Sequence, residues 1–309
     1  MLSVSNKLKI IVICGPTGIG KTSVGIEVAG KFGGEIISAD SMQIYRQMDI
    51  GTAKPTPAEQ AQIAHHMIDI VAPDEAYDAV QFSKQAGERI AEIANRGLIP
   101  FVVGGTGLYI KALLHGLFQT EPVDPKIRNR LKQELEQDGS SCLYGRLAQI
   151  DPDTAGRLHP NDSYRIIRAL ETIESSGKTI SEHHQNHGFE NELFDAFKIG
   201  LRRDREKLYE RIDQRVDLMI QAGLVEEVKK LLAMGYSPEL KSMQSIGYRH
   251  VVGFLNGSLP WAECLRTLKR DTRRFAKRQF TWFGADPLIK WYEPEQLDQI
   301  FDAVDRFLE

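Results

Sequence analysis

The sequence predicts an α/β fold in which a parallel β-sheet is flanked by helices and carries a helical insertion domain. Apolar runs at residues 10–14 and 98–103 each open into a glycine-rich turn before a helical pattern, which is typical of strands buried in a parallel sheet. Helical patterns dominate from about residue 124 to 176, and a strand pattern returns at 194–201. The expected division is a core of residues 1–115 and 198–309 and an insertion domain of residues 116–197.

The first glycine-rich turn matches the phosphate-binding motif G-x-x-x-x-G-K-[ST] in full, between a strand and a helix. Its glycines allow a tight turn in which successive N–H groups face an anion. Lys21 adds a positive charge for a phosphate, and the Thr22 hydroxyl is placed to bind Mg²⁺. The motif predicts a polyphosphate site on a P-loop NTPase-like core, without specifying a nucleoside triphosphate such as ATP. The loop residues are Gly15, Pro16, Thr17, Gly18, Ile19, Gly20, Lys21 and Thr22.

A short strand at residues 35–39 delivers Asp40 at its carboxyl end. Ligands of doubly wound sheets bind beyond the carboxyl ends of the strands, so Asp40 should lie on the same rim as the phosphate loop. Asp40 is therefore a candidate catalytic base, with capping of the next turn as the alternative. Residues 41–57 have no clean helical or strand period and predict a long ordered loop beside the site.

The second glycine-rich turn is Gly104-Gly105-Thr106-Gly107. Common ATPases place an acidic residue at the end of such a strand to hold Mg²⁺, whereas glycine stands here. This argues against simple hydrolysis of a nucleoside triphosphate and leaves small-molecule kinases open. Thr106 is expected either to donate a hydrogen bond into the site or to cap the following helix.

Composition allows a sizeable core, since 42% of the 309 residues are apolar. No N-terminal apolar run approaches the length of a signal peptide or membrane span, so we expect a soluble, cytoplasmic protein. Three widely separated cysteines, without a C-x-x-C pair, are expected to be structural. The adjacent His65 and His66 lack further ligands at suitable spacing, which favours a structural role over metal binding.

Basic residues recur at steps of three and four in the helical pattern at 261–284 and so share a broad face. Few acidic residues match them within the helix, Glu263 and Asp271 alone, so a nucleic-acid backbone is the expected partner despite the net charge of −3. The aromatic residues Phe280, Trp282 and Phe283 are expected to fill the core rather than to stack on a base. The basic residues are Arg266, Lys269, Arg270, Arg273, Arg274, Lys277 and Arg278.

Together these segments resemble one family, the tRNA dimethylallyltransferases, also called tRNA isopentenyltransferases. The resemblance covers nearly the whole chain in the family's order and, with no sign of the zinc finger of eukaryotic members, indicates the bacterial type. The matching stretches are GPTGIGKT (15–22), SADSMQIY (38–45), DIGTAKP (49–55), VGGTGLY (103–109), HPND (159–162), SIGYR (245–249) and KRQFTW (277–282).

The resemblance implies transfer of a dimethylallyl group from dimethylallyl diphosphate to N6 of adenosine 37 in tRNAs that read codons beginning with U. The products would be N6-(dimethylallyl)adenosine and diphosphate. A diphosphate would then occupy the loop, with Mg²⁺ as cofactor beside Thr22. The implied partner is the anticodon stem-loop of tRNA, and the enzyme is expected to be a monomer.

The same resemblance implies Asp40, Thr106 and Lys21 as catalytic residues. Asp40 would accept the amine proton or hold N6 in line, and Thr106 would bind the diphosphate or its bridging oxygen. Residues 182–191 match no motif. The implied tRNA contacts are Asp40, Ser41, Met42, Gln43, Thr106, Arg128, Tyr164, Arg165, Arg168, Gln244, Gly247, Tyr248, Arg249, Lys277 and Arg278.

Two other functions fit part of the sequence. A P-loop small-molecule kinase of the shikimate or nucleotide type explains the loop and the insertion but not the basic helix. A non-catalytic RNA-binding module explains the basic helix, but the intact Lys21-Thr22 pair and Asp40 on the same rim argue against it.

Overall fold

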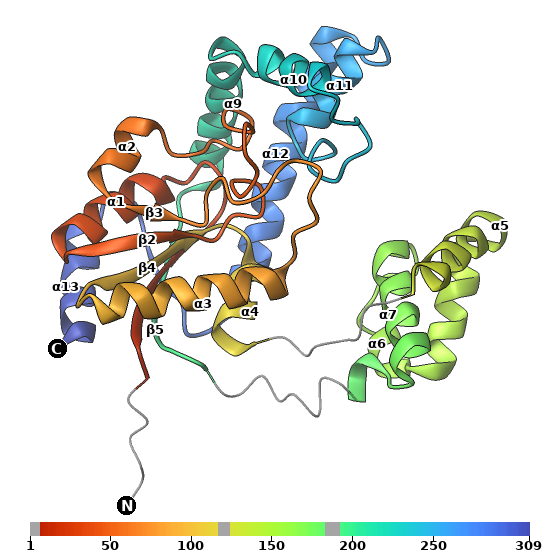
Figure 1. Ribbon diagram of the computed structural model, residues 1–309, viewed down its shortest axis with the longest axis horizontal. Helices are drawn as coiled ribbons and strands as arrows, with labels where there is room; N and C mark the ends of the chain where they lie inside the picture. Colours follow the sequence, from red (N-terminus) through yellow and green to blue (C-terminus); the bar gives the residue numbers. More distant parts are fainter. Residues whose placement is uncertain (1–6, 117–123, 183–191) are drawn as a thin grey trace, which may run out of the picture. The chain divides into compact units, whose positions relative to one another are not determined.

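The computed structural model describes residues 7–116, 124–182 and 192–309. Within these ranges the core is a six-stranded, wholly parallel sheet of order β3-β2-β4-β1-β5-β6 (Figure 1), which confirms the predicted α/β fold. Its strands are β1 (Lys9–Cys14), β2 (Gly34–Ser38), β3 (His65–His66), β4 (Ile99–Gly104), β5 (Asp195–Leu201) and β6 (Lys290–Tyr292).

Helices flank both faces of this sheet (Figure 1), and no helix in the described ranges is long and apolar enough to cross a membrane. The helices of the core are α1 (Lys21–Lys31), α2 (Pro57–Gln62), α3 (Ala79–Asn95), α4 (Gly107–His115), α9 (Arg205–Gln221), α10 (Leu224–Ala233), α11 (Tyr248–Leu255), α12 (Trp261–Gly284) and α13 (Leu297–Leu308). The helices of the insertion are α5 (Pro125–Ile150), α6 (Pro152–Ala155) and α7 (Ser163–Ser176).

The central strand β1 is apolar throughout its length because both faces of the sheet are covered. Ile11 and Ile13 pack in one cluster with Val24 of α1 and with residues of α9 and α13. Side chains alternate across a strand, so Ile10 and Val12 face the opposite side, where α3 packs on β2 and β4. These four isoleucine and valine residues of β1 are all buried, which explains the unbroken apolar run in the sequence.

The chain divides into two compact units, residues 1–114 with 192–309 and residues 115–191. The first unit resumes at Glu192, where the sequence predicted residue 198, and β5 pairs with β1 from Asp195 onwards. Pairing of the strand 194–201 with the sheet is confirmed. Of the unplaced segment 182–191, residues 183–191 lie outside the described residues.

The insertion has its own apolar core, formed by residues such as Leu131, Leu147 and Ile166. The helical pattern from residue 124 to 176 forms α5, α6 and α7, and α5 is kinked at Gly139, whose φ of 79° lies in the left-handed region that favours glycine. Cys142 on α5 is an exposed free thiol, whereas Cys14 and Cys264 of the core are buried.

The loop at residues 41–57 forms turns, as predicted, and is held by two charged side chains. The nearly buried Lys54 ammonium binds the carboxylates of Asp49, at 2.5 Å, and Asp69, at 2.6 Å. From α10, the Glu227 carboxylate accepts hydrogen bonds from three successive backbone N–H groups, those of residues 49–51, at 2.8 to 3.1 Å. It accepts a fourth from the Tyr248 hydroxyl at 2.6 Å. A single carboxylate thus anchors the loop to α10 and α11.

Replacing Glu227 by alanine removes the acceptor shared by these four donors. We expect the free energy of unfolding to fall by about 2–3 kcal/mol, because partly buried donors lose their partner. Denaturant unfolding measures this change. The control is Glu226→Ala, on the same turn of α10 but with a side chain 70% exposed, which should change stability by less than about 0.5 kcal/mol. Equal effects of the two substitutions would contradict the anchoring role.

Candidate active site

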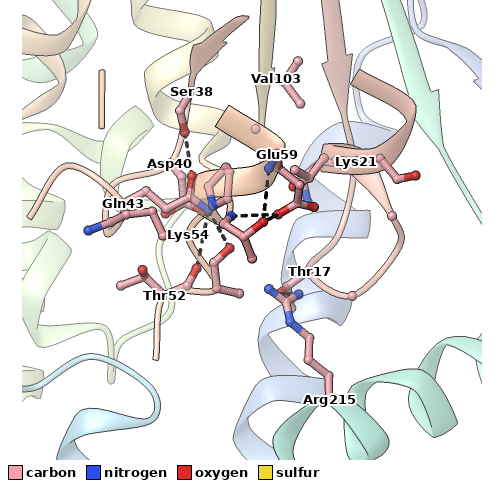
Figure 2. A pocket seen from close by; sticks show the side chains of 18 of the residues that line it. Thr17, Lys21, Ser38, Asp40, Gln43, Thr52, Lys54, Glu59, Val103 and Arg215 are labelled. Carbon is pink, nitrogen blue, oxygen red and sulfur yellow. Dashed lines mark hydrogen bonds between the residues drawn. The ribbon is translucent and has the colours of Figure 1, made fainter. Parts of the chain in front are cut away.

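A cavity of about 700 Å³ opens at the carboxyl ends of β1, β2 and β4 (Figure 2), a size typical of small-molecule sites. Its walls come from the phosphate loop, from Asp40, from the loop at 52–56 and from helices α9 and α12. The phosphate loop and Asp40 therefore share one cavity, as their positions at strand ends predicted.

The phosphate loop has the backbone geometry that its glycines predicted. Gly15, Gly18 and Gly20 all have positive φ, at 148°, 79° and 108°. Gly20 is the N-cap of α1, and no described side chain caps this helix. The first N–H groups of α1 therefore remain for an anion, at the positive end of the helix dipole.

Lys21 is a half-buried cation at the start of α1. Its ammonium donates to the Pro16 carbonyl at 2.8 Å. Burial lowers the pKa of Lys21 to about 8, although the nearby Asp40 carboxylate opposes this shift. The cation is held mainly by a neutral carbonyl, an arrangement that favours an anionic ligand.

Arg215 of α9 is a second half-buried cation, which the sequence analysis did not single out. Figure 2 shows its side chain extending toward Thr17, whose hydroxyl oxygen lies 3.4 Å from the guanidinium. Burial lowers its pKa, and Asp40 again opposes the shift. In the described ranges no carboxylate lies at ion-pair distance from it. The spacing of Arg211 and Arg215 by four residues was the available signal, since it places both on one face of α9.

Asp40 caps the turn after β2 and also lines the cavity. Its carboxylate accepts a hydrogen bond from the Met42 backbone N–H at 2.9 Å and so caps the turn that follows β2. It also lines the cavity and acts electrostatically on Lys21 and Arg215. The capping bond fixes the side chain in this position.

Thr106 does not line the cavity itself, and its hydroxyl is hydrogen-bonded to Ser41. The Thr106 hydroxyl accepts from the Ser41 backbone N–H at 2.9 Å and donates to the Ser41 hydroxyl at 3.3 Å. The Thr106 backbone carbonyl accepts from the Ile110 N–H at 3.2 Å at the start of α4. Thr106 ties the second glycine turn to the residue after Asp40.

Several implied tRNA contacts have different surroundings from those expected. Tyr248 is fully buried with its hydroxyl donating to Glu227, and Gly247 is buried beside it. Gln43 is buried and bonded to Ser38, although it lines the cavity. Ser41 and Met42 are half-buried, and Gln244 and Arg249 are exposed.

The basic face of α12 is partly neutralised by α9, which the sequence analysis did not foresee. Asp213 pairs with Arg273 at 2.6 Å, and Asp217 pairs with Lys269 at 2.7 Å. Within α12, Asp271 pairs with Arg270 at 2.9 Å. The expectation of a mostly uncompensated face is therefore wrong, because acidic partners come from a neighbouring helix.

Two basic residues of α12, Lys277 and Arg278, are exposed and form no ion pair within the described ranges. The aromatic residues that follow them differ in how far they are buried. Phe283 is buried and Phe280 half-buried, as expected, but Trp282 is 45% exposed, so its assignment to the core is wrong.

In the insertion, the implied tRNA contacts lie on or near α7. Arg128 and Arg168 both bind the buried Glu171 carboxylate, at 2.6 and 3.2 Å. Arg165 pairs with Asp162 at 3.1 Å, and Tyr164 is 78% exposed. Glu171 thus holds two of these cations side by side.

No group of three His, Cys, Asp or Glu side chains in the described ranges is arranged to hold a metal ion. His66 bonds the Glu35 carboxylate at 2.7 Å, and His65 bonds the Ile63 carbonyl at 2.8 Å, which confirms their structural role. Thr22 lines the cavity.

Comparison with known proteins gives a consistent family. A family profile described as IPP transferase matches residues 43–286, and one described as Isopentenyl transferase matches residues 8–72. The tRNA dimethylallyltransferase of Desulfosudis oleivorans is 52% identical over 301 residues, covering 97% of this chain and 96% of that protein. The tRNA dimethylallyltransferase 2 of Syntrophus aciditrophicus is 50% identical over 302 residues, covering 98% and 97%.

Solved structures agree. The tRNA isopentenylpyrophosphate transferase of Bacillus halodurans matches with a TM-score of 0.73 at 38% identity, covering 98% of this chain and 97% of that one. A eukaryotic dimethylallyltransferase acting on tRNA matches with a TM-score of 0.79 at 32% identity, covering 97% of this chain and 77% of that one. With a family profile over most of its length and relatives that match it from end to end, this chain belongs to the tRNA dimethylallyltransferase family.

Proposed function

We propose that this protein transfers the dimethylallyl group of dimethylallyl diphosphate to N6 of adenosine 37 in tRNAs that read codons beginning with U. The observation that carries the proposal is a phosphate loop sharing one cavity with a carboxylate, Asp40, and with two half-buried cations, Lys21 and Arg215. The transfer forms a C–N bond at the prenyl carbon and breaks its C–O bond. The amine proton leaves, and diphosphate departs intact.

The phosphate loop, Lys21 and Arg215 bind the diphosphate and stabilise the negative charge that grows on it as the C–O bond breaks. Preorganised cations and N–H groups are effective here because they are already oriented and shielded from water. Arg215 reaches the loop through Thr17, so both cations flank the same anion site.

Mg²⁺ is the proposed cofactor, and the hydroxyl of Thr22 would hold it. The donor set fits, because Mg²⁺ at phosphate sites uses few protein oxygens and takes its other ligands from phosphates and water. Thr22 lines the cavity together with the Asp40 carboxylate. When bound, the ion would neutralise charge on the leaving diphosphate.

Asp40 is proposed to orient the N6 amine and to accept its proton. An exocyclic amine is barely acidic, so its proton is transferred only as C–N bonding advances. The capping bond from Met42 holds the carboxylate in place, and Thr106 supports the same turn through Ser41.

The anticodon stem-loop is the proposed tRNA partner. The exposed Lys277 and Arg278 of α12 offer contacts to its phosphates. The insertion offers the exposed Tyr164 and the paired Arg128 and Arg168. The adenine must leave its stack to reach the cavity, as in other enzymes that modify a base.

A phosphate loop also fits a small-molecule kinase, and the two functions differ in what they consume. The purified protein is incubated with Mg²⁺, dimethylallyl diphosphate labelled in the prenyl group, and unmodified tRNA carrying A36-A37-A38; a parallel reaction contains ATP alone. We expect label in the RNA without ATP. The same tRNA with guanosine at position 37 is the control and should take up none. Release of phosphate from ATP without transfer would support the kinase instead.

Replacing Asp40 by asparagine keeps the shape of the side chain and removes the base. We expect kcat to fall by about 10²- to 10⁴-fold, the usual contribution of a general base, with tRNA affinity changed less than about twofold. Single-turnover transfer and filter binding measure the two quantities. The control is Asp74→Asn, an exposed carboxylate outside the cavity, which should leave both unchanged. Parallel losses of turnover and tRNA binding would contradict the role of a base.

The lowered pKa of Lys21 predicts a pH dependence. Because burial favours the neutral amine, Lys21 carries its charge below about pH 8 and loses it above. The kcat/KM for dimethylallyl diphosphate should therefore fall above about pH 8, approaching a tenfold loss per pH unit. In Lys21→Arg the guanidinium stays protonated, so the loss should disappear from the accessible range. A wild-type profile that stays level to pH 9.5 would rule out Lys21 as the titrating group.

A further inference from the structure

Gln279 of α12 joins the two glycine-rich turns of the site. Its side-chain oxygen accepts a hydrogen bond from the Thr17 backbone N–H at 2.8 Å, across 262 residues of sequence. Its side-chain nitrogen donates to the Gly105 carbonyl at 2.8 Å. Gln279 is 6% exposed and lines the cavity. A buried amide thus connects the phosphate loop to the turn that follows β4.

The turn after β4 is shaped to admit this amide. A Cβ added to Gly105 would lie 2.4 Å from the Gln279 side-chain nitrogen and 3.4 Å from the Lys21 ammonium nitrogen. Any larger residue would therefore displace Gln279 and crowd Lys21. The side chains of Gln279 and Lys21 therefore both lie close to Gly105.

Gln279 is linked to the cations Lys21 and Arg215 through residues of the phosphate loop. Thr17, which donates its backbone N–H to Gln279, also presents its hydroxyl to Arg215 at 3.4 Å. Lys21 donates to Pro16, the residue before Thr17. A shift of Thr17 would therefore move the groups that hold Lys21 and Arg215.

The chemistry of this position suits a primary amide. One end accepts a hydrogen bond from an N–H group and the other donates to a carbonyl, and the glutamine amide offers both at the end of one side chain. Glutamate could accept from Thr17 but would turn a negative oxygen toward the Gly105 carbonyl. Methionine has a similar length and fills the space without either hydrogen bond.

We infer that Gln279 is a positioning residue that holds the phosphate loop in the geometry that binds the diphosphate. The inference rests on the proposed function. Gln279 acts through Thr17 and Gly105, so its loss should weaken binding of the diphosphate group while leaving the tRNA surface intact. In this protein α12 therefore serves the diphosphate site as well as presenting basic side chains.

The test compares Gln279→Met and Gln279→Glu with wild type. The KM for dimethylallyl diphosphate and the dissociation constant of inorganic diphosphate, measured by calorimetry with Mg²⁺, should both rise about tenfold or more, since each lost hydrogen bond contributes about 1 kcal/mol. The tRNA dissociation constant should change less than about twofold. Gln221→Met, at the exposed end of α9, is the matched control and should leave all three constants unchanged.

Gly105→Ala disturbs the same contact from the other side and should weaken diphosphate binding in the same way. Thermal melting identifies the variants that fold. Folded Gln279 and Gly105 variants that bind inorganic diphosphate as wild type does would overturn the inference, as would equal losses of diphosphate and tRNA binding. Absence of prenyl transfer by wild type would instead count against the proposed function, because calorimetry with inorganic diphosphate does not depend on transfer.

Discussion

The site depends on two partly withdrawn positive charges that no adjacent carboxylate neutralises. Lys21 and Arg215 are half-buried, and both have lowered pKa values because they are partly withdrawn from water; Asp40 acts on each from a distance without pairing with either. Withdrawing a cation from water in this way is costly, and an anionic ligand with several oxygens offsets the cost. The N–H groups at the start of α1 add to the same field. These features support the proposed diphosphate site.

The parallel sheet explains why these groups meet. Strands β1, β2 and β4 are neighbours, and their carboxyl ends deliver the phosphate loop, Asp40 and the second glycine turn to one rim. Covering both faces of the sheet buries β1 from Ile10 to Cys14, directly before the loop. Gly105, the first residue after β4, has a role of its own, since it leaves room for the Gln279 side chain that joins the two turns.

The basic side chains fall into two groups, those that pair with acidic residues and those that stay exposed. Asp213, Asp217 and Glu171 bind arginine and lysine side chains and fix their positions. Lys277 and Arg278 remain exposed, so the proposed RNA contacts on α12 are concentrated near its C-terminal end. Glu227 works differently, because it accepts from backbone N–H groups and so shapes the loop that closes the cavity.

The sequence by itself determined the parallel sheet, the phosphate loop and the place of Asp40, because these follow from local patterns: apolar runs, glycine spacing and the ends of strands. It also identified the family through its motifs. Only the tertiary structure decided the roles of Arg215, Gln279 and Glu227, since most of their partners lie between 174 and 262 residues away and helical periodicity does not say which neighbour a face will meet. For the same reason Tyr248 lies in a motif yet is buried, and the charges of α12 were misjudged, because their acidic partners stand on another helix. Motifs mark which residues matter, whereas packing determines whether each one touches the ligand or supports a residue that does.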